Sequence, residues 1–309
     1  MTSFAYLSDR GFLKAGRAAA QPYAVAGIAW DGATTHRPGA RFGPDAIRRA
    51  SHMLCEGTHP LFDVSPLGLL GDAGDLPLPN TALGAMREAL TPLAEALIAR
   101  HHMVWLGGDH SITLPLLRVY RRHLGRALAV VHFDAHCDTW QDHCGEPSGH
   151  GTWVSEALAE GLVEPACFTQ IGIRSAAERA AREHVRERGG QIFTARELRG
   201  RDGDAALAPL LAAIAARQAA HGHPPLYISL DIDCLDPAHA PGTGTPEPGG
   251  LTSSQVLTLL EGLAAQRCVG MDCVEVAPPY DHAELTANAA AHCVWTYLCG
   301  QIARPDGRG

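Results

Sequence analysis

Two short runs of acidic residues and histidine carry the clearest chemical signal in this sequence. In the first run, Asp134, His136 and Asp138 occupy alternate positions. In the second run, much later in the chain, Asp231 and Asp233 do the same. Each run directly follows an apolar segment, so the carboxylates are expected where a buried strand ends. Because acids this close together repel one another unless positive charge neutralises them, the two runs predict a site for divalent cations.

A third apolar segment, Met103–Leu106, leads into two glycines and then Asp109 and His110. The glycines let the backbone turn sharply and present His110 at the start of a helix. A single histidine at a strand end is more often a hydrogen-bonded structural residue than a metal ligand. Three strand ends that supply acids and imidazoles to one edge of a sheet favour metal binding. The predicted ligands are His110, Asp134, His136, Asp138, Asp231 and Asp233.

The order of these residues also predicts how two cations share them. Two cations roughly 3.5–4 Å apart need bridging carboxylates, and Asp134 and Asp231, the first acids of their runs, are the natural bridges. One cation would add His110 and Asp138 to the bridges, and the other would add His136 and Asp233. Carboxylates with a few imidazoles suit Mn²⁺, so we expect two Mn²⁺ per chain. Such a pair lowers the pKa of a bound water and presents it to an electrophilic carbon.

Apolar segments alternate with amphipathic ones along residues 1–309, and we see no linker, so we expect a single α/β domain with a parallel sheet covered on both faces. The predicted strands are Tyr23–Trp30, Leu67–Leu70, Met103–Leu106, Ala127–Phe133, Cys167–Ile173, Leu226–Ile232 and Cys268–Val276. The predicted helices are Pro44–Met53, Ala82–Arg100, Leu114–Arg122, Thr152–Glu160, Ala176–Arg188, Asp204–His221, Ser253–Ala265 and His282–Ile302. The turn-rich run 237–250 is expected to be a rigid loop held against the site.

Composition excludes several classes of function. The net charge of -8 and the sequence pI near 6.1 argue against a nucleic-acid partner and favour a small cationic substrate. No signal peptide is expected, because Met1 to Arg10 lacks an apolar stretch, and no apolar run approaches the length of a membrane span. The nine cysteines include no C-x-x-C pair, which indicates reduced thiols and a cytoplasmic protein.

Four segments together give a specific resemblance: GGDHS at 107–111, DAHCD at 134–138, and the runs 229–250 and 273–287. They resemble the ureohydrolases, the family of arginase and agmatinase, over nearly the whole chain. The runs 39–48 and 170–174 resemble the agmatinase branch more than arginase proper. The resemblance implies a three-layer α/β/α sandwich with a mainly parallel eight-stranded sheet, and a homotrimer or homohexamer. It also implies Mn²⁺-dependent hydrolysis of a guanidino compound to urea and an amine, with agmatine, which gives putrescine, as the leading substrate.

The resemblance assigns roles to further residues. All six metal ligands named above match those of the family. Glu275 matches the glutamate that pairs with the substrate guanidinium, a planar cation that a carboxylate holds through parallel hydrogen bonds. His150 matches the catalytic histidine, whose expected role is proton transfer to the leaving amine. His143, on the same loop, is the next candidate for that role.

The segment around His150 departs from the family pattern and bears on specificity. Trp153 stands where relatives tend to have a smaller or phenylalanine-bearing pair, so it is expected to narrow or rim the pocket. The loop from 139 to 153 contains Asp142 and Glu146 but no lysine or arginine. It should therefore attract an ammonium tail such as that of agmatine and repel the carboxylate tail of guanidinobutyrate.

Other readings stay open. Guanidinobutyrate, guanidinopropionate, guanidine or a larger guanidino natural product are alternative substrates. A non-catalytic regulatory homologue is a minor alternative, since a protein without activity needs neither the full ligand set nor His150 and Glu275. A two-metal phosphatase would be expected to place Arg or Lys beside the metals for phosphate charge, and the metal-binding runs contain neither.

Overall fold

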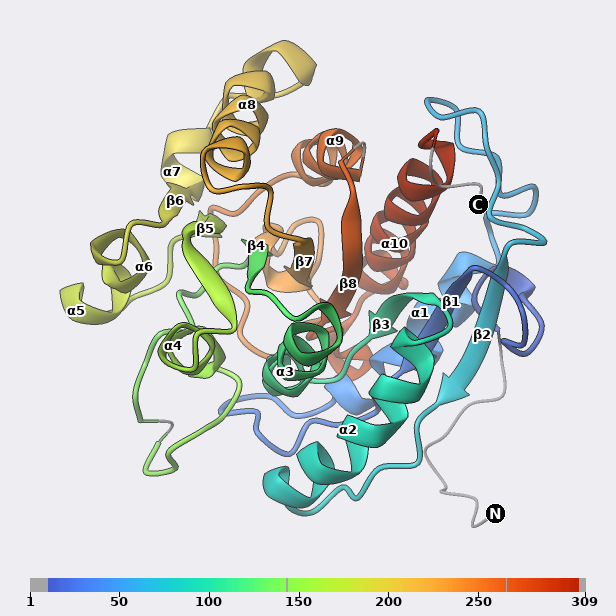
Figure 1. Ribbon diagram of the computed structural model, residues 1–309, viewed down its shortest axis with the longest axis horizontal. Coiled ribbons are helices and arrows are strands. Elements are labelled where there is room, and N and C mark those ends of the chain that lie inside the picture. The colour runs from blue at the N-terminus through green and yellow to red at the C-terminus, as the bar shows by residue number, and fades with distance from the viewer. Residues whose placement is uncertain (1–10, 143, 265, 306–309) are drawn as a thin grey trace.

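The computed structural model describes residues 11–142, 144–264 and 266–305. Its centre is an eight-stranded sheet with the strand order β2-β1-β3-β8-β7-β4-β5-β6 (Figure 1). Every neighbouring pair of strands is parallel. The strands are β1 Tyr23–Gly27, β2 Leu70–Asp75, β3 His102–Leu106, β4 Leu128–Phe133, β5 Val163–Ile173, β6 Gln191–Thr194, β7 Leu226–Asp231 and β8 Cys268–Val274.

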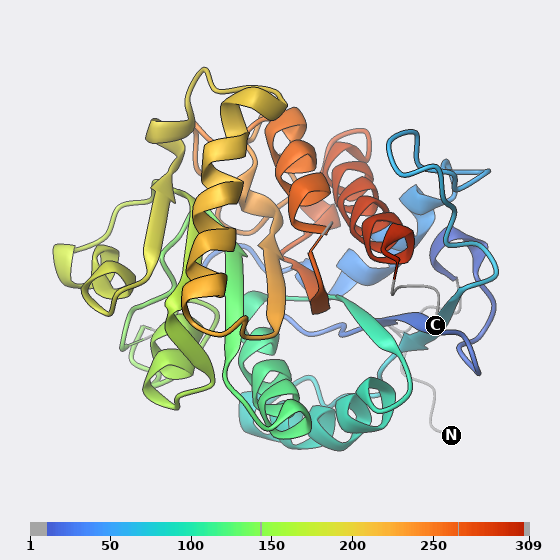
Figure 2. The ribbon, with the colours of Figure 1, turned by 45° about the horizontal axis from the view of Figure 1, so that its top comes forward.

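Helices cover both faces of this sheet (Figure 2). They are α1 Gly43–Ser51, α2 Leu83–Ile98, α3 Thr113–Leu124, α4 Trp153–Ala159, α5 Arg179–Arg182, α6 His184–Glu187, α7 Ala195–Leu198, α8 Asp204–Ala220, α9 Ser253–Ala264 and α10 Leu285–Ala303. Helices α1, α8, α9 and α10 share one apolar core with the sheet, and α2, α3 and α4 share the other. Strand side chains alternate between the two cores: Val104 and Leu106 of β3 face the first, and Met103 and Trp105 face the second. The predicted three-layer α/β/α sandwich is confirmed.

Several element boundaries differ from the prediction. The expected strand at 67–70 lies instead at 70–75. In sequence, Asp72 and Asp75 look too polar for a buried strand, but both carboxylates are paired with Arg48. The fully buried guanidinium of Arg48 donates to Asp72 at 2.8 and 3.0 Å and pairs with Asp75. The expected helix 176–188 is divided at Glu183 into α5 and α6, and the short elements β6 and α7 were not predicted.

The order of the strands explains why distant runs of sequence can meet. Strands β3, β8, β7 and β4 are consecutive neighbours at the middle of the sheet, and all four run in the same direction. Their carboxyl ends therefore open at one edge, where α/β sheets bind their ligands. In the part of the chain that the structure describes, no helix combines the length and apolarity needed to span a lipid bilayer.

Candidate metal centre and active site

Three carboxylates surround Nδ1 of His110. This nitrogen lies 3.2 Å from Asp134 Oδ2, 3.2 Å from Asp138 Oδ2 and 3.1 Å from Asp231 Oδ2. All four side chains are buried. The oxygens come from the exits of β4 and β7 and the imidazole from the exit of β3, as the sequence predicted. We call this group of atoms the inner position.

A tight turn allows His110 to reach the inner position. After β3, a Cβ on Gly108 would lie 1.6 Å from the carbonyl oxygen of Trp30, so only glycine fits there. Asp109 then begins the 3-10 helix His110–Ile112 and accepts a hydrogen bond from the backbone N–H of Ser111 at 3.0 Å. The imidazole of His110 is thereby presented just beyond the strand end.

A second group of ligand-type atoms lies on the other side of Asp134. His136 Nδ1 lies 3.2 Å from Asp134 Oδ1 and 3.0 Å from Asp233 Oδ2. We call this group the outer position, since the His136 side chain is partly exposed. Because the two oxygens of Asp134 face different histidines, this residue is placed to bridge two cations. Asp231 offers Oδ2 to the inner position, while its Oδ1 accepts the backbone N–H of Asp233 at 2.9 Å.

The carboxylates of this cluster repel one another and need positive charge nearby to become fully ionised. Burial, together with repulsion from Asp233 and Asp134, raises the pKa of Asp231 well above its ordinary value. Burial and Asp134 raise the pKa of Asp233 in the same way. Acids with raised pKa values at a buried site become fully ionised only when cations compensate them. Two clusters within the described residues have the donor atoms to hold a metal ion. They are His110, His132, Asp134 and Asp138 at the inner position, and Asp134, His136 and Asp233 at the outer position. The residues therefore fit two divalent cations.

Hydrogen bonds that involve Ser229 and Asp272 determine which nitrogen of His110 can bind a cation. Ser229 Oγ donates to Asp272 Oδ1 at 2.7 Å, so it accepts the hydrogen of His110 Nε2 at 2.8 Å. Nδ1, which faces the three carboxylates, is therefore the ring nitrogen that can bind a cation. Asp272 is fully buried and also accepts hydrogen bonds from Thr113 and Tyr227. Sequence reasoning missed Ser229 and Asp272 as supporting residues, although each is a polar residue inside an otherwise apolar strand.

Glu275 joins the metal centre to His150. Its Oε1 accepts the backbone N–H of His110 at 2.9 Å and lies 2.9 Å from His150 Nδ1. Its Oε2 is buried and has no hydrogen-bond partner among the described residues. The backbone of Glu275 is left-handed, with φ of 64°, which is unfavourable for a residue with a side chain. Its N–H bonds Gly108 O at 2.8 Å, so the strained conformation is held by the neighbouring strand exit.

Two opposing effects determine the pKa of His150. Burial lowers its pKa, but the hydrogen bond and charge of Glu275 outweigh burial and raise the pKa to about 9. The backbone N–H of Thr35 points at Nε2 from 3.2 Å, and the Thr35 hydroxyl oxygen lies 2.9 Å from the same nitrogen. With a pKa of about 9 the ring carries a second proton at neutral pH, so Nδ1 donates to Glu275 Oε1 and Nε2 faces the hydroxyl oxygen of Thr35. This arrangement is suited to a group that stores a proton and gives it up.

A cavity of about 250 Å³ opens over these groups. Its walls are Thr35, His110, His136, Asp138, Trp140, Asp142, Cys144, His150, Gly151, Asp231 and Thr245. The wall thus includes His150, the predicted specificity acid Asp142 and four of the six predicted ligands. The other two ligands, Asp134 and Asp233, and Glu275 are not part of the wall and are buried. Thr35, Trp140 and Thr245 were not predicted, because nothing in their local sequence sets them apart from other loop residues.

Two predicted residues lie elsewhere. Trp153 does not narrow or rim the pocket: its side chain is fully buried, and Nε1 donates to Asp138 Oδ2 at 2.8 Å. The reason is that Trp153 begins α4, whose first turn packs beneath the ligands. Glu146 is exposed and is not part of the cavity wall. His143, the alternative proton donor, lies outside the described residues.

The chain is similar to known proteins over almost its whole length. The model of the arginase family matches residues 21–300. An agmatinase of Cronobacter sakazakii is 42% identical over 286 residues, which cover 91% of this chain and 88% of the relative. Two solved structures also superpose closely. A hypothetical agmatinase from Burkholderia thailandensis has a TM-score of 0.83 at 36% identity, covering 94% of this chain and 90% of that one. The proclavaminate amidino hydrolase from Streptomyces clavuligerus has a TM-score of 0.85 at 34% identity, covering 96% and 98%.

The match spans every strand from β1 to β8, and thus every strand exit that contributes to the metal centre. The relatives named above are hydrolases of guanidino or amidino compounds by their names. From the family match and these relatives, the chain belongs to the arginase family and is a ureohydrolase that acts on C–N bonds of amidines.

Proposed function

We propose that this chain hydrolyses agmatine to urea and putrescine with two Mn²⁺ ions. The observation that carries the proposal is the free Oε2 of Glu275, a buried carboxylate oxygen without a partner among the described residues. Leaving such an oxygen unpaired is costly, and a guanidinium can satisfy it with N–H groups in a fixed plane. The agmatinase relative at 42% identity supports agmatine as the substrate.

The residues of the chain divide the work as follows. When bound, two divalent cations supply a water of lowered pKa for attack on the guanidinium carbon. Glu275 is placed to orient the substrate, because its Oε1 is fixed by His110 N–H and its buried Oε2 has no partner among the described residues. His150 lines the cavity, and its raised pKa keeps the ring doubly protonated at neutral pH, so that it has one proton to give up. It is placed to pass this proton to the amine nitrogen as the C–N bond breaks.

A urea-release assay on the Mn²⁺-loaded protein tests the function. Agmatine, arginine, guanidinobutyrate, guanidinopropionate and guanidine should be compared as substrates, with the metal-free protein as control. We expect the highest kcat/KM with agmatine and putrescine as the second product. If none of these compounds releases urea above the metal-free control, the proposal is wrong.

A larger guanidino natural product is the second candidate substrate. The observation that favours it is the close superposition with the proclavaminate amidino hydrolase, which includes 98% of that chain. The same assay distinguishes the two candidates if a bulky guanidino metabolite is added to the series. A higher kcat/KM for that compound than for agmatine would select this alternative.

The assembly and the cellular setting are also proposals. We propose a homotrimer or homohexamer, since Met53, Leu61 and Leu67 leave large apolar side chains exposed and available for contact between chains. All cysteines are free thiols, and all but Cys55 and Cys144 are buried, which is typical of proteins from the reducing cytoplasm.

We predict that Asp142→Asn raises KM for agmatine severalfold. Asp142 lines the cavity, and the surrounding loop offers no cation to a substrate carboxylate. Because Asp142 is exposed, its attraction for an ammonium tail should be about 0.2–1 kcal/mol.

The measurement is KM for agmatine and for guanidine, which has no tail and should not respond. Glu146→Gln is the matched control, since Glu146 lies outside the cavity wall. Wild-type protein that prefers guanidinobutyrate to agmatine would overturn this account.

We predict that His150→Asn keeps both cations but lowers kcat on the order of 10²-fold, because general acid help is lost.

Wild-type kcat/KM should also fall as pH rises and His150 loses its proton. With its pKa raised to about 9, and lowered somewhat by bound cations, this alkaline limb should lie at or below about pH 9. The variant should lack the limb. An unchanged kcat would transfer the role to another residue, with His143 as the next candidate.

A further inference from the structure

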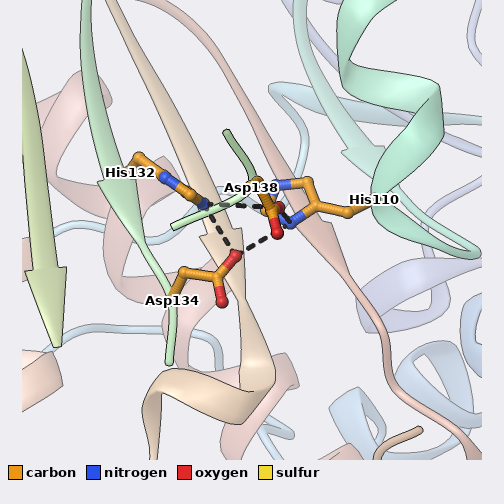
Figure 3. A group of neighbouring side chains, drawn as sticks. All are labelled: His110, His132, Asp134 and Asp138. Carbon is orange, nitrogen blue, oxygen red and sulfur yellow. Dashed lines mark hydrogen bonds and ion pairs between the residues drawn. The ribbon is translucent and has the colours of Figure 1, made fainter. Parts of the chain in front are cut away.

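His132 lies among the metal ligands, yet its role is not given by the ligand pattern. It is fully buried within β4, two residues before Asp134, and Nε2 lies 2.7 Å from Asp134 Oδ2. Figure 3 shows its ring facing the same carboxylates that surround His110. By distance alone it could be an additional metal ligand. The hydrogen bonds on its other nitrogen decide the question.

Gln170 on the neighbouring strand β5 fixes the tautomer of His132. Gln170 Nε2 lies 2.8 Å from the carbonyl oxygen of Cys137 and 3.1 Å from His132 Nδ1. An atom that bonds a carbonyl oxygen must be the donor, so the amide orientation is set by its surroundings. The same NH₂ group then donates to Nδ1, which is the acceptor nitrogen of the ring. Nε2 therefore carries the hydrogen and donates it to Asp134 Oδ2, and a protonated nitrogen cannot bind a metal.

Trp153 makes an equivalent contact to the next ligand. Its Nε1–H donates to Asp138 Oδ2 at 2.8 Å. The indole ring packs against two neighbouring imidazoles, with centroids 4.9 Å from His110 and 4.9 Å from His132. Because the ring is fully buried, it cannot turn away from Asp138 without opening a void. The position of this N–H is therefore set by packing.

We propose that His132 and Trp153 form a pair of donors that positions the carboxylates of the inner metal position. Each places one N–H on an oxygen that faces His110 Nδ1, at Asp134 Oδ2 and Asp138 Oδ2. The donated hydrogen occupies one lone-pair direction and leaves the other for the cation, so the carboxylate is held in the orientation that binds metal. His132 is then a positioning residue and not a ligand.

The outer position is supported mainly by backbone donors. Ala135 N–H donates to Asp233 Oδ1 at 3.0 Å and His136 N–H donates to Asp134 Oδ1 at 2.6 Å, while the hydroxyl of Thr245 lies 3.3 Å from Asp233 Oδ2. Loss of the two side-chain donors leaves these backbone contacts in place, so it should weaken the inner cation more than the outer one. This inference rests on the two-cation centre of the proposed function but is independent of the substrate, so a different substrate would not affect it.

Mn²⁺ titration of the metal-free protein tests the inference, with affinity from calorimetry and bound Mn²⁺ per chain from elemental analysis. In Trp153→Phe and His132→Leu, we expect the affinity of one Mn²⁺ to fall about 10- to 100-fold. The other should be unchanged in Trp153→Phe, which affects only Asp138, and should change less in His132→Leu, where Asp134 Oδ1 keeps the His136 N–H. Two Mn²⁺ should still bind at saturation. His132→Gln restores a donor near the position of Nε2 and should recover most of the affinity. Trp295→Phe is the matched control, because it also removes a 2.8 Å bond from a buried indole N–H, there to Gly57 O.

Two results would overturn the inference. If His132→Leu binds only one Mn²⁺ at saturation, as is expected for the ligand variant His110→Ala, then His132 is itself a ligand. If Trp153→Phe and His132→Leu both bind two Mn²⁺ with wild-type affinity, the donors have no positioning role. Melting temperatures of the metal-free variants should be compared with wild type, and either variant that folds is sufficient to decide. No substrate enters the measurement, so failure here is distinct from failure of the agmatinase assay.

Discussion

Asp231→Ala is expected to lose both Mn²⁺ ions and all detectable urea release. Its Oδ2 belongs to the inner position, 3.1 Å from His110 Nδ1, and the sequence predicts that it bridges to the outer one. Removing it takes a ligand from both cations and one negative charge from between them, so the two cations repel each other with less compensation. The site is buried, and water cannot easily replace the lost carboxylate.

Elemental analysis after gel filtration measures this outcome. His110→Ala and Asp138→Ala each remove a ligand from the inner position alone, so they should keep about one Mn²⁺ per chain. Asp142→Asn should keep both, because Asp142 lines the cavity but is not a predicted ligand. Two Mn²⁺ retained in Asp231→Ala would contradict the bridging role of Asp231.

The metal centre could be predicted from sequence because its signal is local. Each acidic run is short, directly follows an apolar strand and needs no knowledge of which strands are neighbours. The parallel sheet then brings the exits of β3, β4 and β7 to one edge, which the alternation of strands and helices already implied. Asp134 and His136 are two residues apart, so their proximity follows from the chain itself.

The supporting contacts could not be predicted, because they join residues that are adjacent only across strands. Ser229 and Asp272 lie side by side on β7 and β8, and His132 and Gln170 lie side by side on β4 and β5. In sequence, each is a single polar residue in an apolar strand, and the partner is visible only when the register is known. Trp153 was misplaced for the same reason, since its position depends on how α4 packs against α3 and β5.

Glu275→Gln is the second variant with a large expected effect, and it separates binding of the guanidinium from binding of metal. Gln has the shape of Glu, but one oxygen becomes a donor. Oε1 must stay as the acceptor for His110 N–H, which lies 2.9 Å away, so the new NH₂ group takes the place of the free Oε2. A donor then faces the N–H groups of the guanidinium, and the negative charge that balances this cation is gone.

Loss of one partner from a buried, hydrogen-bonded charge pair costs about 2–5 kcal/mol, so kcat/KM for agmatine should fall roughly 30-fold to several-thousand-fold. Both Mn²⁺ ions should remain, since Glu275 is not a predicted ligand. The pKa of His150 should also fall from about 9, because Glu275 is the group that raises it against burial. NMR titration of His150 and elemental analysis measure these two effects independently of turnover. If kcat/KM stays within severalfold of wild type while the pKa of His150 falls, Glu275 holds the histidine and not the substrate, and another acid of the cavity must bind the guanidinium.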